Sequence, residues 1–112
     1  MSIQNADYSN INFEEMATAI GLKAKHIPML IGSFMDESVG ILASLEEAVN
    51  SNDYAQIKAH AHSIKGSAGN LKFNEVYEMA KVMELGAADA KSDIDYNSYL
   101  SAIKSAVATI PN

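Results

Sequence analysis

Apolar residues recur at spacings of three and four along most of this chain, which is the period of an amphipathic helix. The first run of this kind is short, because Asn12 can cap a helix and Gly21 can end it. The second begins at Pro28, a residue suited to the first turn of a helix, and continues for about six turns to Asn50. Gly40 lies within this long helix, and we interpret it as the site of a close contact with another helix, with a local kink as the alternative.

A third helix should follow after a very short connection. Asp53 is followed three residues later by a glutamine, which is a capping-box pattern, so this helix should begin at about Tyr54. It should end at Gly69 or Asn70, since both residues are acceptable at a helix terminus. Asn74 can then cap a fourth helix, which carries the same apolar period.

A last helix should open at Asp93 or Asp95 and be stopped by Pro111. No stretch alternates with period two for long, and no Asn-Gly or Asp-Gly hairpin signal occurs. Short links between long amphipathic helices make neighbouring helices antiparallel. The sequence therefore predicts an all-α fold, an antiparallel up-down-up-down four-helix bundle with a short extra N-terminal helix across one end.

Composition and charge narrow the classes of function. A chain of 112 residues fits a single domain spanning 1–112, in which the polar segment 1–10 should be loosely ordered. The formal charge of −6 disfavours nucleic acid as a partner, and no apolar run approaches the roughly 20 residues that cross a bilayer. Glycine-rich nucleotide-binding loops are absent, so the chain has no visible means of binding ATP. We expect a cytoplasmic, soluble monomer. It has no disulfides, because the sequence contains no cysteine.

The helix predicted at 54–70 carries one histidine on a surface cleared of bulky side chains. Its apolar stripe is formed by Ile57, Ala61, Ile64, Ala68 and Leu71. His62 points about 100° or more away from the centre of that stripe. Glycine inside a helix costs roughly 1 kcal/mol relative to alanine, so Gly66, one turn after His62, indicates that something must come close. Lys58 and Lys65 lie one turn to either side of His62, so they predict that the group approaching His62 is anionic.

His60 is a poor partner for His62 in a metal site. The two residues lie about 160° apart around the helix, whereas zinc-binding helices use positions i and i+4. We interpret His60 as a boundary residue that is hydrogen-bonded or half exposed. A metal-binding four-helix protein would need inward-facing Glu-x-x-His pairs, and this sequence has none.

The run His62-Ser63-Ile64-Lys65-Gly66-Ser67-Ala68 resembles the signature of histidine-containing phosphotransfer (HPt) domains of bacterial and fungal phosphorelays. That signature is a histidine, two residues, Lys-Gly and two small residues, and its histidine carries the phosphoryl group. The predicted order of helices also fits. The resemblance implies that His62 is phosphorylated, that Lys65 offsets charge on the phosphoryl oxygens, and that Gly66 leaves room for the active site of a partner.

The resemblance also implies partners and a mechanism. His62, through Nε2, would take the phosphoryl group from an aspartyl phosphate on a response-regulator receiver domain and pass it to another receiver. The partners would be receiver domains and a hybrid sensor histidine kinase, with Mg²⁺ held by the receiver and no cofactor of the chain's own. The chain would be a phosphoryl carrier, not an enzyme. The alternative is an HPt-like docking module that binds or inhibits a receiver without chemistry.

One position departs from the HPt pattern. Ten residues after the phosphorylated histidine, where the chain leaves the helix, many members have a glycine, and here the residue is Lys72. We therefore expect Gly69 or Asn70 to take the left-handed conformation instead, or the turn to differ. The roles of Lys58, His60 and Lys72 stay open at this point.

Overall fold

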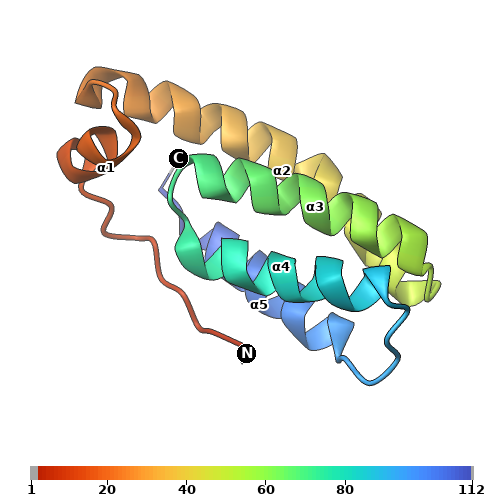
Figure 1. Cartoon of the computed structure of the whole chain (residues 1–112). Coiled ribbons are helices and arrows are strands. Elements are labelled where there is room, and N and C mark those ends of the chain that lie inside the picture. The colour runs from red at the N-terminus through yellow and green to blue at the C-terminus, as the bar shows by residue number, and fades with distance from the viewer. Residues whose placement is uncertain (1–2, 112) are drawn as a thin grey trace.

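The computed structural model describes residues 3–111, and the regular elements in that range are all helices, with no strand. Its elements are α1 (Phe13–Ile20), a short 3-10 helix η1 (Ala24–His26), α2 (Ile27–Asn50), α3 (Tyr54–Asn70), α4 (Asn74–Ala88) and α5 (Tyr96–Ala108). In Figure 1, α2 to α5 lie side by side, the links between them alternate between the two ends, and α1 lies near the start of α2. The all-α prediction is confirmed.

Local capping explains where three of the helices begin. The side chains of Asn12, Asp53 and Asp95 each accept a hydrogen bond from the backbone N–H three residues later, at 3.1, 3.2 and 3.1 Å. These contacts satisfy one of the free N–H groups at each helix start. Of the two candidates for the last helix, Asp95 is therefore the cap. Gly21 ends α1 with a φ of 75°, in the left-handed region that glycine adopts without strain.

The turn between α3 and α4 differs from the prediction. Gly69 and Asn70 are both helical, and Lys72 itself takes the left-handed conformation, with a φ of 62°. The N–H of Lys72 donates to the carbonyl of Gly69 at 3.2 Å, and the N–H of Phe73 donates to the carbonyl of Ala68 at 3.0 Å. This pair of bonds is a Schellman motif, which closes a helix by using one left-handed residue. A lysine here fills the place where HPt domains often have glycine.

The prediction that Asn74 caps the fourth helix is wrong. Asn74 is the first residue of α4, Phe73 occupies the capping position, and no side chain caps this terminus. The Schellman turn is the physical reason, because it reverses the chain within two residues and leads directly from Lys72 into α4. The buried Phe73 side chain, 1% exposed, anchors the start of α4 by packing.

The helix α3 lies between α2 and α4 and packs against both. The predicted apolar stripe of α3 is confirmed, since all five of its residues are at most 5% exposed.

Two aromatic contacts close the core at one end of the bundle. Phe73 packs against Phe34 with ring centroids 5.2 Å apart, and against Tyr8 with ring centroids 4.6 Å apart. Burying a large apolar side chain contributes about 1.5 to 3 kcal/mol, so the buried stripe of α3 and this aromatic cluster together stabilise the packing of the helices.

The N-terminal segment is held more specifically than its polar composition predicts, although residues 1–2 lie outside the described range. The Tyr8 N–H donates to Thr109 Oγ1 at 2.8 Å, and the Tyr8 hydroxyl donates to Glu75 Oε1 at 2.8 Å. The phenol ring meanwhile packs on Phe73. An aromatic ring with a hydrogen-bonded polar tip is a strong anchor, so these contacts tie the part of the segment around Tyr8 to the bundle.

The long helix differs from two predictions, one that no segment is long and apolar enough to cross a bilayer and one that Gly40 makes a close contact. By length and composition, the segment Ala24–Asn50 could cross a membrane, with a mean hydropathy of 1.2, although core helices of soluble proteins pass the same test. One face of α2 packs in the bundle, with Ile31, Phe34 and Leu45 buried. Gly40 is exposed on the other side, where an added Cβ would meet nothing within 4 Å. The close-contact interpretation of Gly40 is therefore wrong, and α2 continues as one helix through it.

Candidate functional site

The helix α3 presents His62 to solvent. Its neighbours Ala61 and Ile64 point into the core and are fully buried, so the helix cannot rotate without exposing them. The His62 side chain is 67% exposed. A nucleophilic or acceptor nitrogen at this position is accessible to another protein.

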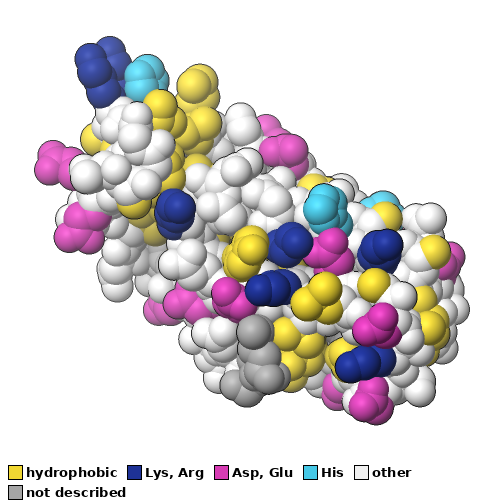
Figure 2. Space-filling view, in the orientation of Figure 1, with side chains coloured by type: hydrophobic (Ala, Val, Ile, Leu, Met, Phe, Trp, Pro, Cys, Tyr) yellow, Lys and Arg dark blue, Asp and Glu magenta, His cyan; other side chains and the backbone are white. Residues whose placement is uncertain are grey.

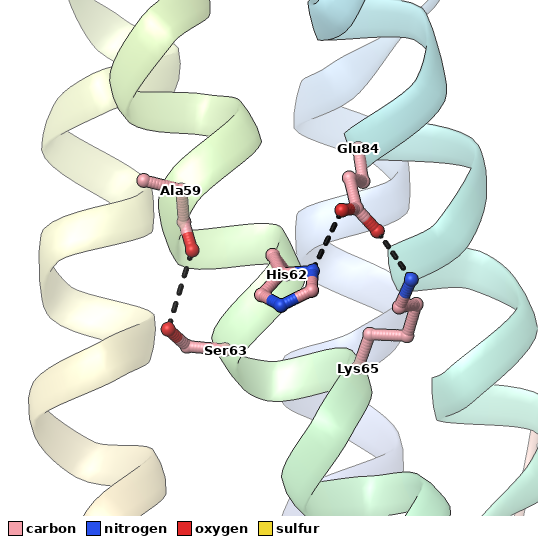
Figure 3. Close-up of polar contacts among 5 residues, drawn as sticks. All are labelled: Ala59, His62, Ser63, Lys65 and Glu84. Atoms are coloured by element: carbon pink, nitrogen blue, oxygen red, sulfur yellow. Dashed lines mark hydrogen bonds and ion pairs between the residues drawn. The ribbon is translucent and has the colours of Figure 1, made fainter.

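A glutamate from the neighbouring helix holds the imidazole ring. His62 Nδ1 lies 2.7 Å from Oε2 of Glu84, which belongs to α4 (Figure 3). An ionised carboxylate can only accept a hydrogen bond, so we assign the proton of the neutral ring to Nδ1. The other nitrogen, Nε2, then carries the lone pair, and in Figure 3 it lies on the side of the ring away from Glu84. Nε2 makes no hydrogen bond to any residue in the range 3–111.

The same carboxylate holds the lysine of the motif. Lys65 Nζ lies 2.6 Å from Oε1 of Glu84, and the two side chains are 22% and 13% exposed. Burial alone would raise the pKa of Glu84, but the contacts with Lys65 and His62 outweigh burial and hold its pKa below the ordinary value. The carboxylate beside it likewise raises the pKa of Lys65. Both groups are therefore charged at neutral pH.

The sequence reasoning missed Glu84, because helix periodicity reports only on neighbours within one helix. The antiparallel arrangement of α3 and α4 offered a signal. His62 and Glu84 are each 11 residues from Phe73, since 73 − 62 = 11 and 84 − 73 = 11. Residues equally far from a tight turn lie opposite each other in an antiparallel pair. Gly69 and Tyr77, each four residues from Phe73, obey the same register, with an added Cβ at Gly69 falling 3.1 Å from the Tyr77 ring.

Gly66 lies one turn after His62 and is exposed. A Cβ added there would meet nothing within 4 Å in the described part of the molecule. Gly86, by contrast, lies against Ile94, and a Cβ there would collide with that side chain. Packing within the domain therefore explains glycine at 86 and gives no reason for glycine at 66.

The other candidate residues lie outside this arrangement. His60 Nε2 is 3.1 Å from Gln56 Oε1 and the residue is half-buried, which confirms its interpretation as a hydrogen-bonded boundary residue. No group of three His, Asp or Glu side chains in residues 3–111 could hold a metal ion. Lys58 and Lys72 are exposed, and neither forms an ion pair within that range.

Comparison with known proteins assigns the family. A family model described as the Hpt domain matches residues 29–110, which include α3, α4 and the whole of the His62, Lys65 and Glu84 arrangement. No curated protein and no solved structure matches the chain. Hpt domains are phosphocarrier modules of two-component systems that interact with receiver and kinase domains, and they are not ATP-binding kinases. Because the match covers most of its length, the chain belongs to the Hpt domain family.

Proposed function

We propose that this chain is a histidine phosphotransfer protein that accepts a phosphoryl group on His62 Nε2 from the aspartyl phosphate of a receiver domain. It then passes the group to a second receiver in a phosphorelay. The observation that carries the proposal is the contact between His62 Nδ1 and Glu84, which in the neutral ring puts the lone pair on Nε2, the nitrogen away from Glu84. Family membership supplies the class of reaction.

The reaction is an in-line displacement. The Nε2 lone pair attacks the phosphorus atom, an N–P bond forms, and the P–O bond to the aspartyl group breaks as its carboxylate leaves. The ring keeps its Nδ1 proton and becomes positively charged during the attack. Glu84 stabilises that charge and fixes the ring orientation, as the carboxylate of a catalytic triad does for its histidine. Return of the group reverses these steps, so no net turnover is required.

Lys65 is placed to neutralise charge on the phosphoryl oxygens. Its ammonium group has three donors, and Glu84 engages it in the free protein. An incoming phosphoryl group, with up to two negative charges, accepts hydrogen bonds from the remaining N–H donors of Lys65, and the ion pair with Glu84 stays in place. Phosphoryl transfer depends mainly on positioning and electrostatic stabilisation, so a pre-positioned lysine suffices.

The receiver would dock beside His62 on an apolar surface formed by α1, α2 and α3. A groove of about 330 Å³ opens between α1, α2 and the C-terminal end of α3, and Ile20, Leu22 and Leu30 line its α1 and α2 side. Leu22, in the link after α1, is 48% exposed, and Met29, in the first turn of α2, is 65% exposed. Apolar side chains gather on this end of the molecule in Figure 2. Exposed apolar clusters of this kind mark sites of protein interaction.

Several expectations belong with this proposal. The helices form an antiparallel up-down-up-down bundle in a single cytoplasmic, monomeric domain. The receiver holds the Mg²⁺ ion, and the chain needs no cofactor. A hybrid sensor histidine kinase would supply the phosphoryl group at the head of the relay.

A transfer assay tests the proposal. The purified chain is mixed with receiver domains of the same organism, phosphorylated beforehand on aspartate, and assayed for acid-labile, base-stable phosphate. We expect label on the wild type and on His60→Gln, which is the matched control on the same helix. We expect none on His62→Gln and slower labelling of Lys65→Ala. Receiver binding without label, unchanged in His62→Gln, would favour the docking-module alternative.

A further inference from the structure

A second apolar groove lies on the flank of α2 that packs against α5. It has a volume of about 330 Å³, and its apolar lining comes from Val39, Leu42, Ala43, Val107 and Ala108. Val39 is 72% exposed, more than any other large apolar side chain that the structure describes. The groove between α1, α2 and α3 lies on the other flank of α2, where Ser33 and Glu37 line it together with residues of α3. The two grooves are therefore separate surfaces.

Gly40 lies on the exposed side of α2 beside the second groove. It follows Val39 directly and comes three residues before Ala43, and all three residues are exposed. A glycine within a helix is destabilising relative to alanine, yet an added Cβ at Gly40 would meet nothing within 4 Å in the described part of the chain. Contacts inside the domain therefore give no reason for this glycine. Together with the small Ala43, it lets the backbone of another molecule come close to α2.

Acidic residues stand at both ends of this exposed strip. Asp36 lies one turn before Val39 and Gly40, and Glu47 lies one turn after Ala43. Neither carboxylate forms an ion pair within residues 3–111, and α2 contains no lysine or arginine. From Asp36 to Glu47 the strip extends along α2 for about 16 Å, or three turns. We call the residues Asp36, Val39, Gly40, Ala43 and Glu47 the α2 strip.

We propose that the α2 strip and the groove beside it bind a basic amphipathic helix of another protein. The partner helix lays a face of small or apolar residues on Val39, Gly40 and Ala43. Its lysine or arginine side chains pair with Asp36 and Glu47 at the two ends. An amphipathic helix in an apolar groove is a common mode of recognition, and complementary charges fix its register.

The shape and charge of the surface favour this occupant over two others. An extended segment binds by adding a strand to the edge of a sheet, and the described part of this chain has no strand. A second copy of the chain would bring the acidic residues of its own α2 against Asp36 and Glu47, and like charges repel. The inference goes beyond the proposed function, because a helix bound between α2 and α5 holds the domain to another protein and leaves His62 on α3 exposed.

A designed peptide tests the inference on the full chain. The probe is a helical peptide of about 18 residues, or five turns, with alanine and leucine on one face and lysine on both flanks. In the control peptide, glutamate replaces every lysine. In ¹H–¹⁵N spectra, the lysine peptide should shift the signals of Val39, Gly40, Ala43 and Val107 and leave those around His62 unchanged. The control peptide should shift none of them.

Variants of the chain separate shape from charge. Gly40→Gln places a bulky side chain in the centre of the strip, and Ala55→Gln does the same at an exposed position of α3. Glu47→Lys reverses a charge of the strip, and Asp93→Lys makes the same change of net charge in the exposed link before α5. Circular dichroism verifies that all four variants fold, and fluorescence anisotropy of the labelled lysine peptide measures its affinity.

We expect Gly40→Gln to weaken binding about tenfold at any salt concentration. Glu47→Lys should weaken it about fivefold at low salt, with the difference vanishing at about 0.5 M salt, while both controls stay within about twofold of wild type. Three results would overturn the inference. The first is wild-type affinity in Gly40→Gln, and the second is a lysine peptide that binds elsewhere or not at all.

The third contradictory result is a different occupant of the same surface. Sedimentation velocity would detect a dimer of the chain, and a dimer that Gly40→Gln dissociates would assign the strip to a second copy. A receiver domain that shifts the signals of Val39, Ala43 and Val107 would assign the strip to the receiver. Loss of phosphoryl transfer with peptide binding intact would instead contradict the proposed function alone.

Discussion

At the scale of single residues, the site depends on one carboxylate that makes two contacts. Glu84 fixes the tautomer of His62 through one oxygen and holds Lys65 through the other. The place of the motif residues on one helix could be predicted from the sequence, because they recur at spacings of three and four, and their role in transfer stays a prediction. Glu84 could not be found by that reasoning, since it comes from another helix.

The ion pair gives a pH dependence of stability. The pKa of Glu84 is lowered in the folded protein from its ordinary value of 4.5. Its contribution to the free energy of unfolding is therefore present above pH 4.5 and is lost as the pH falls through the folded pKa. The pKa of Lys65 is raised from 10.5, so its contribution is present below that pH and is lost in more alkaline solution.

Urea unfolding as a function of pH measures this effect. The wild type should lose stability relative to Glu84→Gln as the pH falls below 4.5. Only the wild type has a carboxylate here, and the contacts with Lys65 and His62 that favour its ionised form are lost when it is protonated. Parallel curves for the two proteins in acid would show that Glu84 is not stabilised by these contacts.

A substitution at Gly66 should raise stability and slow phosphoryl transfer. Alanine there meets no atom within 4 Å and improves the helix propensity, so Gly66→Ala should raise the free energy of unfolding by about 0.5 to 1 kcal/mol. Transfer from a receiver should nevertheless slow, because the added methyl group faces the docking partner.

Gly40→Ala is the matched control for this prediction. Gly40 is also an exposed glycine within a helix whose Cβ would meet nothing within 4 Å. The control should gain similar stability, measured by urea unfolding, and keep wild-type transfer. Unimpaired transfer in Gly66→Ala would mean that no partner approaches this turn.

At the scale of elements, helix boundaries could be predicted where a local side chain makes them. Asn12, Asp53 and Asp95 cap helices through contacts three residues away, and those contacts are visible in the sequence. The start of α4 could not be predicted in this way, because it is set by the Schellman turn and by burial of Phe73. The left-handed Lys72 was missed because a lysine is rarely chosen for that conformation.

Lys72 should therefore be a point of strain. A left-handed conformation costs a residue with a side chain about 1 kcal/mol, which glycine avoids. Lys72→Gly should raise the free energy of unfolding by about 0.5 to 1 kcal/mol in urea titrations. Lys72→Ala removes the same charge and keeps the strained conformation, so it should show no such gain. Equal stability changes in both variants would assign the effect to charge.

At the scale of the whole molecule, the bundle makes the site rigid. The helix α3 packs between α2 and α4, so the helix that bears His62 and the helix that bears Glu84 share one core. The fold class followed from periodicity alone, because every long helix keeps its apolar stripe on one side. The anchoring of Tyr8 on α4 and α5 could not be predicted, since its partners Glu75 and Thr109 are 67 and 101 residues away in sequence.

The most direct test of the central claim is the ¹H–¹⁵N spectrum of the histidine rings before and after incubation with a phosphorylated receiver. Before phosphorylation, the neutral form of His62 should carry its proton on Nδ1. Afterwards, phosphorus coupling should appear at Nε2 of His62, with the His26 and His60 signals unchanged. Phosphorylation on Nδ1 of His62, phosphorylation of another histidine, or no phosphorylation from any receiver would contradict the account.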